Sequence, residues 1–355
     1  MLVLLIVFGL ICLYGIKLSS FHPDYMGTAQ TGSVKGMFAM IILFSHLRSY
    51  LTVTAPADLL YCTLLDLIGQ LMVTLFFFYS GYGILESFQH KENYTGSFFK
   101  NRILKTLIHF DMAVLLFLIL SLLLGQAYSP NTYVLCWIGW TSLGNSNWFV
   151  FDMLVLYLVT WPALLLANRT RRKPLWACLL TSVFSLTLWI VLRKLRPGFW
   201  EVIWYNTILC YPLGMWYSLV REGLDRLWQR RKALSWLSLV LVMVCFLGCG
   251  LLYRRTGQIM VYSLYACVFS LLVVLITTKV KVDNPILRWL GENSFAIYIL
   301  QRLPMILMEH FGLAEYNLPF AVLSIALTLP LAWGFNKLYA LVDRRLFPAR
   351  QLQTS

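Results

Sequence analysis

The sequence contains little charge. Asp, Glu, Lys and Arg together make up 12% of its 355 residues, whereas 59% are hydrophobic and the mean hydropathy is +0.72. A soluble domain needs more polar residues than this to cover its surface. The composition therefore excludes an ordinary soluble protein and predicts an all-α, polytopic transmembrane helix bundle.

Several kinds of functional site are also missing. The eight cysteines are scattered through apolar segments, and the closest pair, Cys245 and Cys249, has the spacing of one helical turn. We expect these cysteines to pack within the bundle, because neither a disulfide framework nor a Cys/His metal-ligand cluster is present. The sequence has no glycine-rich nucleotide loop, and no arginine-rich block predicts binding to nucleic acid. We therefore expect the chemistry within the membrane bundle or at its rims, without a metal.

Apolar segments long enough to cross a membrane recur along the chain. Residues 1–17 carry no charged side chain before Lys17, whereas a cleaved signal peptide normally begins with a basic region, so we expect an uncleaved N-terminal transmembrane helix there. Residues 33–345 are expected to form one membrane-embedded domain. The eleven candidate helices are residues 1–16, 34–51, 58–88, 102–124, 147–167, 175–192, 200–220, 233–252, 259–278, 293–310 and 320–341.

Basic residues are distributed unevenly among the loops. One set of alternate loops contains twenty-one Lys and Arg residues and the opposite set five, when Arg48, Arg302 and Lys337, which fall within helices, are set aside. Because loops rich in Lys and Arg stay in the cytoplasm, we expect the N-terminus outside and the C-terminus in the cytoplasm. Lys35 then lies at the cytoplasmic mouth of the second helix.

The second helix carries two ionisable residues, Lys35 and His46, eleven positions apart. This spacing is about three helical turns, so both side chains lie on one face, separated by about 16 Å along the axis. His46 would then lie near the middle of a hydrocarbon layer about 30 Å thick. A histidine at that depth is costly unless it is a general base, relays a proton or hydrogen-bonds a neighbouring helix.

A second group of basic residues begins the fourth helix. Arg102, Lys105 and His109 have the spacing i, i+3, i+7, which predicts a basic helical face. Such a face is either an anchor at the cytoplasmic surface or a site for the phosphate groups of a soluble donor.

Ser80 lies among aromatic residues and two glycines. The glycines favour close packing of helices, but packing does not explain the presence of the Ser80 hydroxyl.

The loop at residues 125–146 has no charged residue and is rich in Asn, Ser, Tyr and Trp. It contains Asn145 and leads to Asn147, Trp148 and then Asp152 within the next helix. Aromatic and amide groups of this kind either bind a sugar ring or form an interfacial belt. The later segment GENSFAIYILQR, residues 291–302, is too polar to face lipid and is expected to face the bundle interior.

Five separated motifs resemble those of a known family, the integral-membrane acyltransferases called acyltransferase family 3, which O-acylate cell-surface and exported glycans. The motifs are Lys35-x10-His46, the segment FFYSGYGI from Phe77 to Ile84, the pair Arg102-x-x-Lys105, the Asn147-Trp148-Phe149 helix start, and the segment from Ser294 to Gln301. Two departures are present. Lys105 stands where a second arginine is usual, and Gln301 stands where a histidine is often found, so no role is transferred to Gln301.

The resemblance implies a ten-helix core, with the helix at residues 1–17 as an addition. It implies an O-acyltransferase, an O-acetyltransferase in the usual case, of the plasma or inner membrane. Acetyl-CoA or another acyl-CoA would be a co-substrate rather than a permanently bound cofactor, with its phosphates on Arg102 and Lys105. His46 would act as general base or acyl relay, and Lys35 would hold the donor or orient the site.

The acceptor implied by the resemblance is a glycan or lipid-linked sugar that approaches from the outer side. Ser80, Trp148 and Asp152 are the candidate residues for binding it. Two other functions stay open for this sequence. A transporter or flippase for a lipid-linked saccharide would use His46 and Asp152 as proton-linked groups, and a non-catalytic membrane sensor could be built on the same fold.

Overall fold

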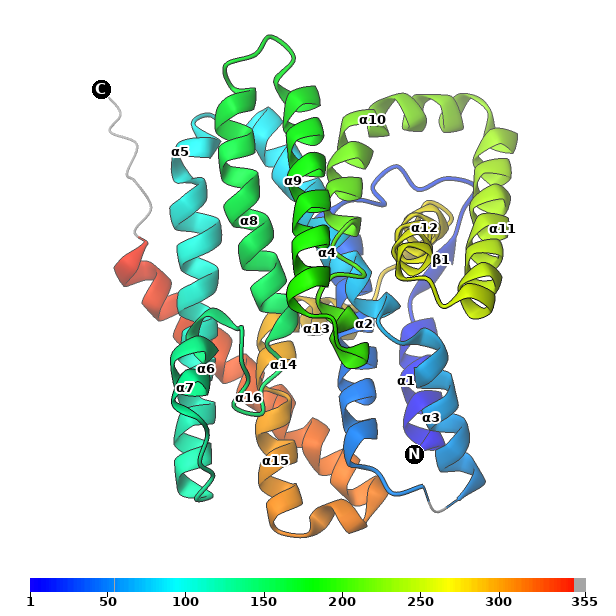
Figure 1. Cartoon of the computed structure of the whole chain (residues 1–355). Helices are drawn as coiled ribbons and strands as arrows, with labels where there is room; N and C mark the ends of the chain where they lie inside the picture. Colours follow the sequence, from blue (N-terminus) through cyan, green and yellow to red (C-terminus); the bar gives the residue numbers. More distant parts are fainter. Residues whose placement is uncertain (54, 348–355) are drawn as a thin grey trace.

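The computed structural model describes residues 1–53 and 55–347, and these residues form a bundle of helices (Figure 1). A two-stranded antiparallel sheet, β1 with β2, is a small addition to it. The elements are α1 (Leu2–Leu13), β1 (Ile16–Leu18), α2 (Thr28–Leu47), α3 (Pro56–Ile68), α4 (Leu71–His90), α5 (Tyr94–Phe98), α6 (Lys105–Leu123), α7 (Pro130–Leu135), α8 (Trp148–Ala167), α9 (Lys173–Leu195), α10 (Cys210–Arg230), α11 (Lys232–Thr256), α12 (Ile259–Thr277), β2 (Val280–Val282), α13 (Pro285–Glu292), α14 (Ser294–Leu300), α15 (Arg302–His310) and α16 (Asn317–Leu346).

Long helices run alternately up and down in Figure 1, from α2 through α11, as a chain that repeatedly crosses a membrane must. Among the described residues, seven helical stretches are long and apolar enough to span a membrane. They are residues 56–90, 94–123, 148–167, 173–195, 232–256, 259–277 and 317–346. The all-α, polytopic fold class predicted from the sequence is thereby confirmed. The orientation of the bundle stays a prediction from the loop charges.

Several predicted helices differ in their limits. The helix predicted at residues 34–51 begins six residues earlier, at Thr28, and its α-helical part ends at Leu47. The helix predicted at 58–88 is broken at Gly69, whose positive φ of 48° ends α3 before α4 begins. The helix predicted at 293–310 is divided at Gln301 into two short helices, α14 and α15, because Pro304 has no amide proton to bond the carbonyl of Leu300.

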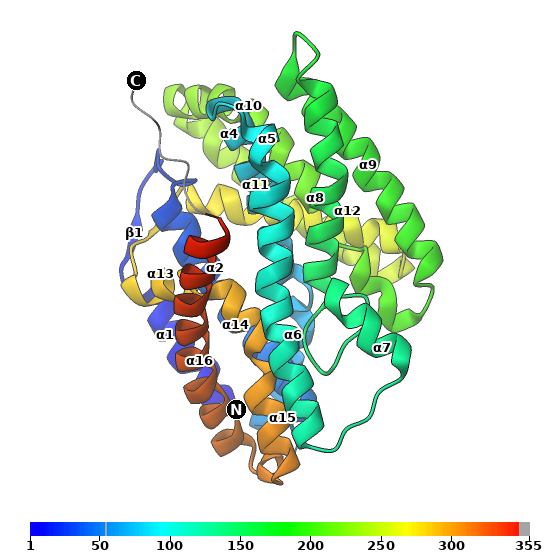
Figure 2. The same ribbon diagram turned by 90° about the vertical axis from the view of Figure 1, so that its left-hand side faces the viewer.

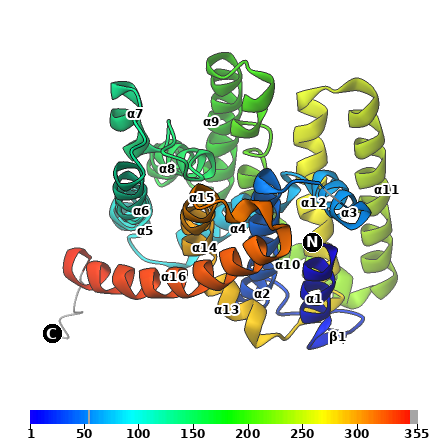
Figure 3. The same ribbon diagram turned by 90° about the horizontal axis from the view of Figure 1, so that it is seen from below.

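Helix α2 lies near the centre of the bundle, where α4 and α14 also lie in the view from below (Figure 3). It packs against α13 through glycines. A Cβ added at Gly36 would lie 1.9 Å from the carbonyl oxygen of Leu287, and one added at Gly291 would lie 1.9 Å from that of Gly32. Because real Cβ atoms do not approach this closely, only glycine permits this separation of the helix axes. Small residues thus fix α2 against α13.

A second close interface joins α4 to α10. A Cβ at Gly81 would lie 1.9 Å from the carbonyl oxygen of Tyr211, and one at Gly214 would lie 2.0 Å from that of Phe78. One of the two glycines that follow Ser80 is therefore required for packing. The other, Gly83, has no atom within 4 Å of an added Cβ.

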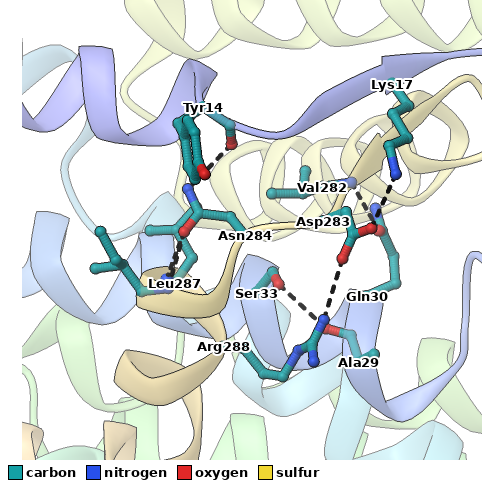
Figure 4. A network of polar contacts seen from close by, with 11 residues as sticks. Tyr14, Lys17, Ala29, Gln30, Ser33, Val282, Asp283, Asn284, Leu287 and Arg288 are labelled. Atoms are coloured by element: carbon teal, nitrogen blue, oxygen red, sulfur yellow. Dashed lines mark hydrogen bonds and ion pairs between the residues drawn. The ribbon is translucent and has the colours of Figure 1, made fainter.

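The N-terminal segment is attached to the bundle by the polar network in Figure 4. Asn284 caps α13 and donates hydrogen bonds to the carbonyls of Ile11 (2.6 Å) and Tyr14 (3.1 Å). Lys17 pairs with Asp283 at 3.1 Å beside the paired strands. These contacts hold the end of α1 beside the start of α13.

Two further contacts continue the network. Gln30 of α2 donates to the carbonyl of Val280 and accepts from the backbone amide of Val282, which satisfies the outer edge of β2. The ring of Phe8 in α1 packs edge-on against Phe44 of α2, with centroids 5.4 Å apart. Residues 1–17 are therefore packed into the same core as α2.

Candidate active site

A cavity of about 370 Å³ lies between α2, α4, α6, α8 and α14. We call it the central cavity. It brings together three residues that the sequence analysis selected, from three distant parts of the chain. These residues are Lys35, Ser80 and Arg102. Tyr79, Tyr157 and Ser294 also contribute to its wall.

The central cavity has a positive wall. Lys35 and Arg102 line it, and no carboxylate lines it among the described residues. Neither cation forms an ion pair with a carboxylate in the part of the chain that the structure describes. Two unneutralised cations in a recess favour an anionic ligand.

Arg102 reaches this cavity because of a local change in helix geometry. Residues Phe99–Leu104 form a π-helical segment between α5 and α6. A π turn contains more residues than an α turn, so it rotates Arg102 away from the side-chain row that α-helical spacing predicts. Such segments are frequent at functional sites.

Lys105 lies elsewhere. Its ammonium group pairs with the carboxylate of Asp343 on α16, at 2.6 Å, and it is not part of the wall of the central cavity. His109 contacts the same carboxylate at 2.9 Å and stacks on the ring of Tyr339 at 3.9 Å. The three basic residues predicted to share one face are therefore divided: Arg102 lines the cavity, whereas Lys105 and His109 join α6 to α16.

A narrower space continues from the central cavity along α2. It has a volume of about 50 Å³, and Ala39 and Ile42 form its α2 side. These two residues lie between Lys35 and His46 on the same helical face. Aromatic rings shared with the central cavity, those of Phe76 and Phe149, form the opposite side. The space leads from the cations toward His46.

His46 lies in the last turn of α2, where α14 and the loop before α8 meet. Its ring contacts Tyr298 edge-on, with centroids 6.4 Å apart, and its Nε2 atom lies 3.4 Å from the hydroxyl oxygen of Ser146. The guanidinium group of Arg302 lies within electrostatic range of the imidazole. The hydroxyl of Tyr298 is buried and has no hydrogen-bond partner among the described residues.

Asp152 is completely buried one turn into α8, and neither of its carboxylate oxygens has a hydrogen-bond partner in the described part of the chain. Arg196 and Tyr298 are within electrostatic range of this carboxylate. Arg196 is held between the rings of Trp140 and Trp204, 3.9 and 4.2 Å from their centroids. A buried carboxylate without partners is costly, which marks Asp152 as a candidate functional residue.

Asn145 and Asn147 hold the backbone of the loop before α8 in position through hydrogen bonds. The side-chain oxygen of Asn145 accepts from the amide of Leu143 at 3.0 Å, and the amide of Asn147 donates to the carbonyl of Gly139 at 2.7 Å. Trp148 packs edge-on against Phe149 at 6.2 Å. The loop is thus fixed in position, with Ser146 beside His46.

Three residues around His46 and Asp152 were not predicted as site residues from the sequence: Tyr298, Arg302 and Arg196. The first two lie in the polar segment at residues 291–302, which was expected to face the interior, but nothing in that pattern distinguished one polar residue from another. Arg196 is one of the five basic residues in the loops that the charge distribution assigns to the outside. Its position over two indole rings depends on contacts between residues far apart in the sequence.

The chain matches the family model described as an acyltransferase domain over residues 32–337. It belongs to acyltransferase family 3. The match begins in α2 and ends in α16, so it includes all of the candidate residues named above, while α1 and β1 precede it. Comparison with curated proteins and with solved structures finds no match.

Membership of acyltransferase family 3 confirms the resemblance seen in the sequence and identifies the chain as a multi-pass membrane acyltransferase. The cation Lys35 in the basic recess and the half-buried His46 lie on one face of α2, within the matched segment.

Proposed function

We propose that this acyltransferase transfers an acyl group, an acetyl group in the simplest case, from a cytoplasmic acyl-CoA to a hydroxyl of an envelope or exported glycan or lipid-linked sugar. The observation that supports it is the arrangement along α2. Lys35 lies in a basic cavity at one end and His46 lies at the other end. A narrow aromatic-walled space lies between them and extends as far as Tyr298, whose ring contacts His46.

The donor enters from the basic end. Arg102 binds the diphosphate of the acyl-CoA, for which a guanidinium group is well suited. The uncharged arm of the donor extends past Phe76 and Phe149 toward His46, over a distance of about 16 Å along α2. Lys35 holds the donor at the mouth of this path. Acyl-CoA is consumed as a co-substrate in each cycle.

His46 supplies the base. Its Nε2 atom takes the proton of the acceptor hydroxyl as the oxygen attacks the thioester carbonyl. The carbon–sulfur bond then breaks, and the thiolate leaves and recovers the proton. In the alternative order, Nε2 itself attacks the thioester, and the acyl group resides on the imidazole until the acceptor removes it. The unpartnered hydroxyl of Tyr298 donates a hydrogen bond to the carbonyl oxygen, where negative charge develops.

The acceptor binds on the outer side of His46. The buried carboxylate of Asp152 accepts a hydrogen bond from a sugar hydroxyl, and Trp148 offers a face on which a sugar ring can pack. Ser80 lies on the donor side instead, where its hydroxyl is 2.9 Å from that of Tyr157. We therefore assign Ser80 to the wall around the donor.

The test compares His46→Gln with wild type and with His310→Gln, a histidine exposed at the end of α15. Each is expressed in a strain from which the gene has been deleted, and the O-acyl content of its surface glycans is measured by mass spectrometry. Glutamine can hydrogen-bond but cannot take up the proton. We expect His310→Gln to restore acylation and His46→Gln to reduce it by about 100-fold or more. Equal acylation by both variants would refute the role of His46.

A further inference from the structure

A second, larger cavity lies at the end of the bundle that the loop charges assign to the cytoplasm. It has a volume of about 810 Å³ and lies between the α4–α5 turn and the loop that joins α8 to α9. Figure 2 shows the ends of α4, α5 and α8 together at this end of the molecule. We call it the turn cavity; its wall includes Lys91, Asn93, Tyr94, Asn168 and Lys173.

We propose that the turn cavity binds the phosphorylated adenosine end of the acyl-CoA donor, and that its lysines recognise the 3′-phosphate. This inference rests on the proposed function. It assigns the two ends of one ligand to two cavities: the adenosine and its 3′-phosphate to the turn cavity, and the diphosphate and acyl-bearing arm to Arg102 and the central cavity.

The charge of the turn cavity fits a polyanion. Lys91 and Lys173 are both exposed and come from opposite walls, whereas Glu92 is the one carboxylate in the described wall. The α8–α9 loop continues the positive charge with arginines at positions 169, 171 and 172. Primary ammonium groups are common phosphate ligands, because they act as point charges with three donors.

Hydrogen bonds to Thr95 hold polar groups of the turn cavity in position. The side-chain amide of Asn168 donates to the hydroxyl of Thr95 at 2.8 Å, and the indole of Trp161 donates to the carbonyl of Thr95 at 3.3 Å. Tyr94 is 8% exposed, and its hydroxyl interacts with the guanidinium group of Arg102. A fixed amide in the wall is suited to hydrogen bonds with a nucleoside, and Tyr94 connects this wall to Arg102.

The two cavities are close neighbours. Tyr94, in the wall of the turn cavity, packs edge-on against Phe98 at 5.7 Å, and Phe98 packs edge-on against Tyr157 at 6.0 Å. Tyr157 belongs to the wall of the central cavity, so the ring of Phe98 lies between one residue of each wall. Arg102 lies within electrostatic range of both Tyr94 and Tyr157.

The order of the charged and aromatic groups matches that of the parts of the donor. A guanidinium group lies between a basic outer cavity and an inner path with aromatic walls, in the same order as the adenosine phosphate, diphosphate and uncharged arm of an acyl-CoA. Binding in this way requires the buried Phe98 ring to turn aside. The volume of the turn cavity is within the range of ligand sites in proteins.

The test measures affinity for two ligands that differ only in the 3′-phosphate, CoA and dephospho-CoA. The full-length protein is purified in detergent as wild type, Lys91→Gln, Lys173→Gln and Lys232→Gln, and binding is measured by isothermal titration calorimetry. Lys232 is exposed at the start of α11 and lines neither cavity, so its substitution removes the same charge without touching the proposed site.

Wild type is expected to bind CoA more tightly than dephospho-CoA. Lys91→Gln and Lys173→Gln are each expected to weaken CoA binding on the order of tenfold and to leave dephospho-CoA binding unchanged, because only the contact to the 3′-phosphate is lost. Lys232→Gln is expected to bind both ligands as wild type does.

Two results would overturn the inference in different ways. If wild type binds CoA but the ratio of the two affinities is the same in all four proteins, the turn cavity does not bind the 3′-phosphate, and the proposed acyl-CoA donor still stands. If wild type binds neither ligand, the proposed donor is wrong, and the inference fails with it.

Discussion

Replacing Gly36 by alanine should disturb the active site without touching any residue in it. The added Cβ would lie 1.9 Å from the carbonyl oxygen of Leu287, whereas ordinary contact begins at 3.4 Å. The obstacle is backbone and cannot rotate away, so α2 and α13 must separate by about 1.5 Å or lose their register. Overpacking of this kind typically costs about 1–3 kcal/mol of folding free energy.

The same shift changes the geometry around His46. Helix α2 carries Lys35 and His46, and α14, which follows α13, carries Tyr298. A displacement of about 1 Å between reacting groups can lower a rate by about 100-fold. We therefore expect Gly36→Ala to lower the melting temperature of the detergent-purified protein and to reduce the initial rate of transfer of a labelled acyl group by a factor of that order.

Gly83→Ala is the matched control, because Gly83 also lies within a long helix but has no atom within 4 Å of an added Cβ. It should react as wild type does and melt at the same or a slightly higher temperature, because alanine favours the helix more than glycine does. If Gly36→Ala behaves like Gly83→Ala in both assays, the two helices are not held by this contact, and the position of His46 does not depend on it.

Four further substitutions test separate parts of the site and the attachment of the N-terminal segment. Arg102→Gln should weaken acyl-CoA binding by about 10-fold or more in calorimetry, whereas Lys105→Gln should lower the melting temperature and leave donor affinity near that of wild type; equal losses of affinity would contradict this division. Tyr298→Phe should lower kcat on the order of 100-fold with little change in donor affinity, and an unchanged kcat would exclude its hydroxyl from the reaction. The hydrogen bond and charge of Lys17 hold the pKa of Asp283 below its usual range, so their contact stabilises the fold above about pH 4 and is lost as the pH falls through the folded pKa. Melting temperatures between about pH 3 and pH 6 should therefore fall less steeply in Lys17→Met than in wild type, and parallel curves would show that the contact contributes nothing.

The helical fold could be predicted because hydropathy and loop charge are local properties of the sequence. The breaks within helices were harder to place. Gly69 ends α3 through a backbone conformation that its neighbours in sequence do not require. The packing of Gly36 and Gly291 against opposing carbonyl groups also depends on which helices meet, and the sequence of one helix does not contain that information.

In the candidate site, too, some positions could be predicted from local spacing, whereas others depend on contacts between distant segments. Lys35 and His46 lie on one face of α2 because a regular helix has a fixed period, so their relation followed from spacing alone. Arg102 and Lys105 did not obey that period, since a π-helical segment lies between α5 and α6 and changes the rotation per residue. Tyr298 acquires its importance from its contact with His46, 252 positions away in the sequence, which spacing could not indicate.

In the proposed mechanism, the basic cavity and His46 belong to one path along which an acyl group moves from a thioester to a hydroxyl. The most direct measurement uses the full-length protein in liposomes, with acyl-CoA labelled in its acyl group added on one side and a glycan acceptor enclosed on the other. We expect wild type to place the label covalently on the enclosed acceptor and His46→Gln to leave the acceptor unlabelled. Movement of the glycan across the membrane without covalent label, or equal labelling by His46→Gln, would contradict this mechanism.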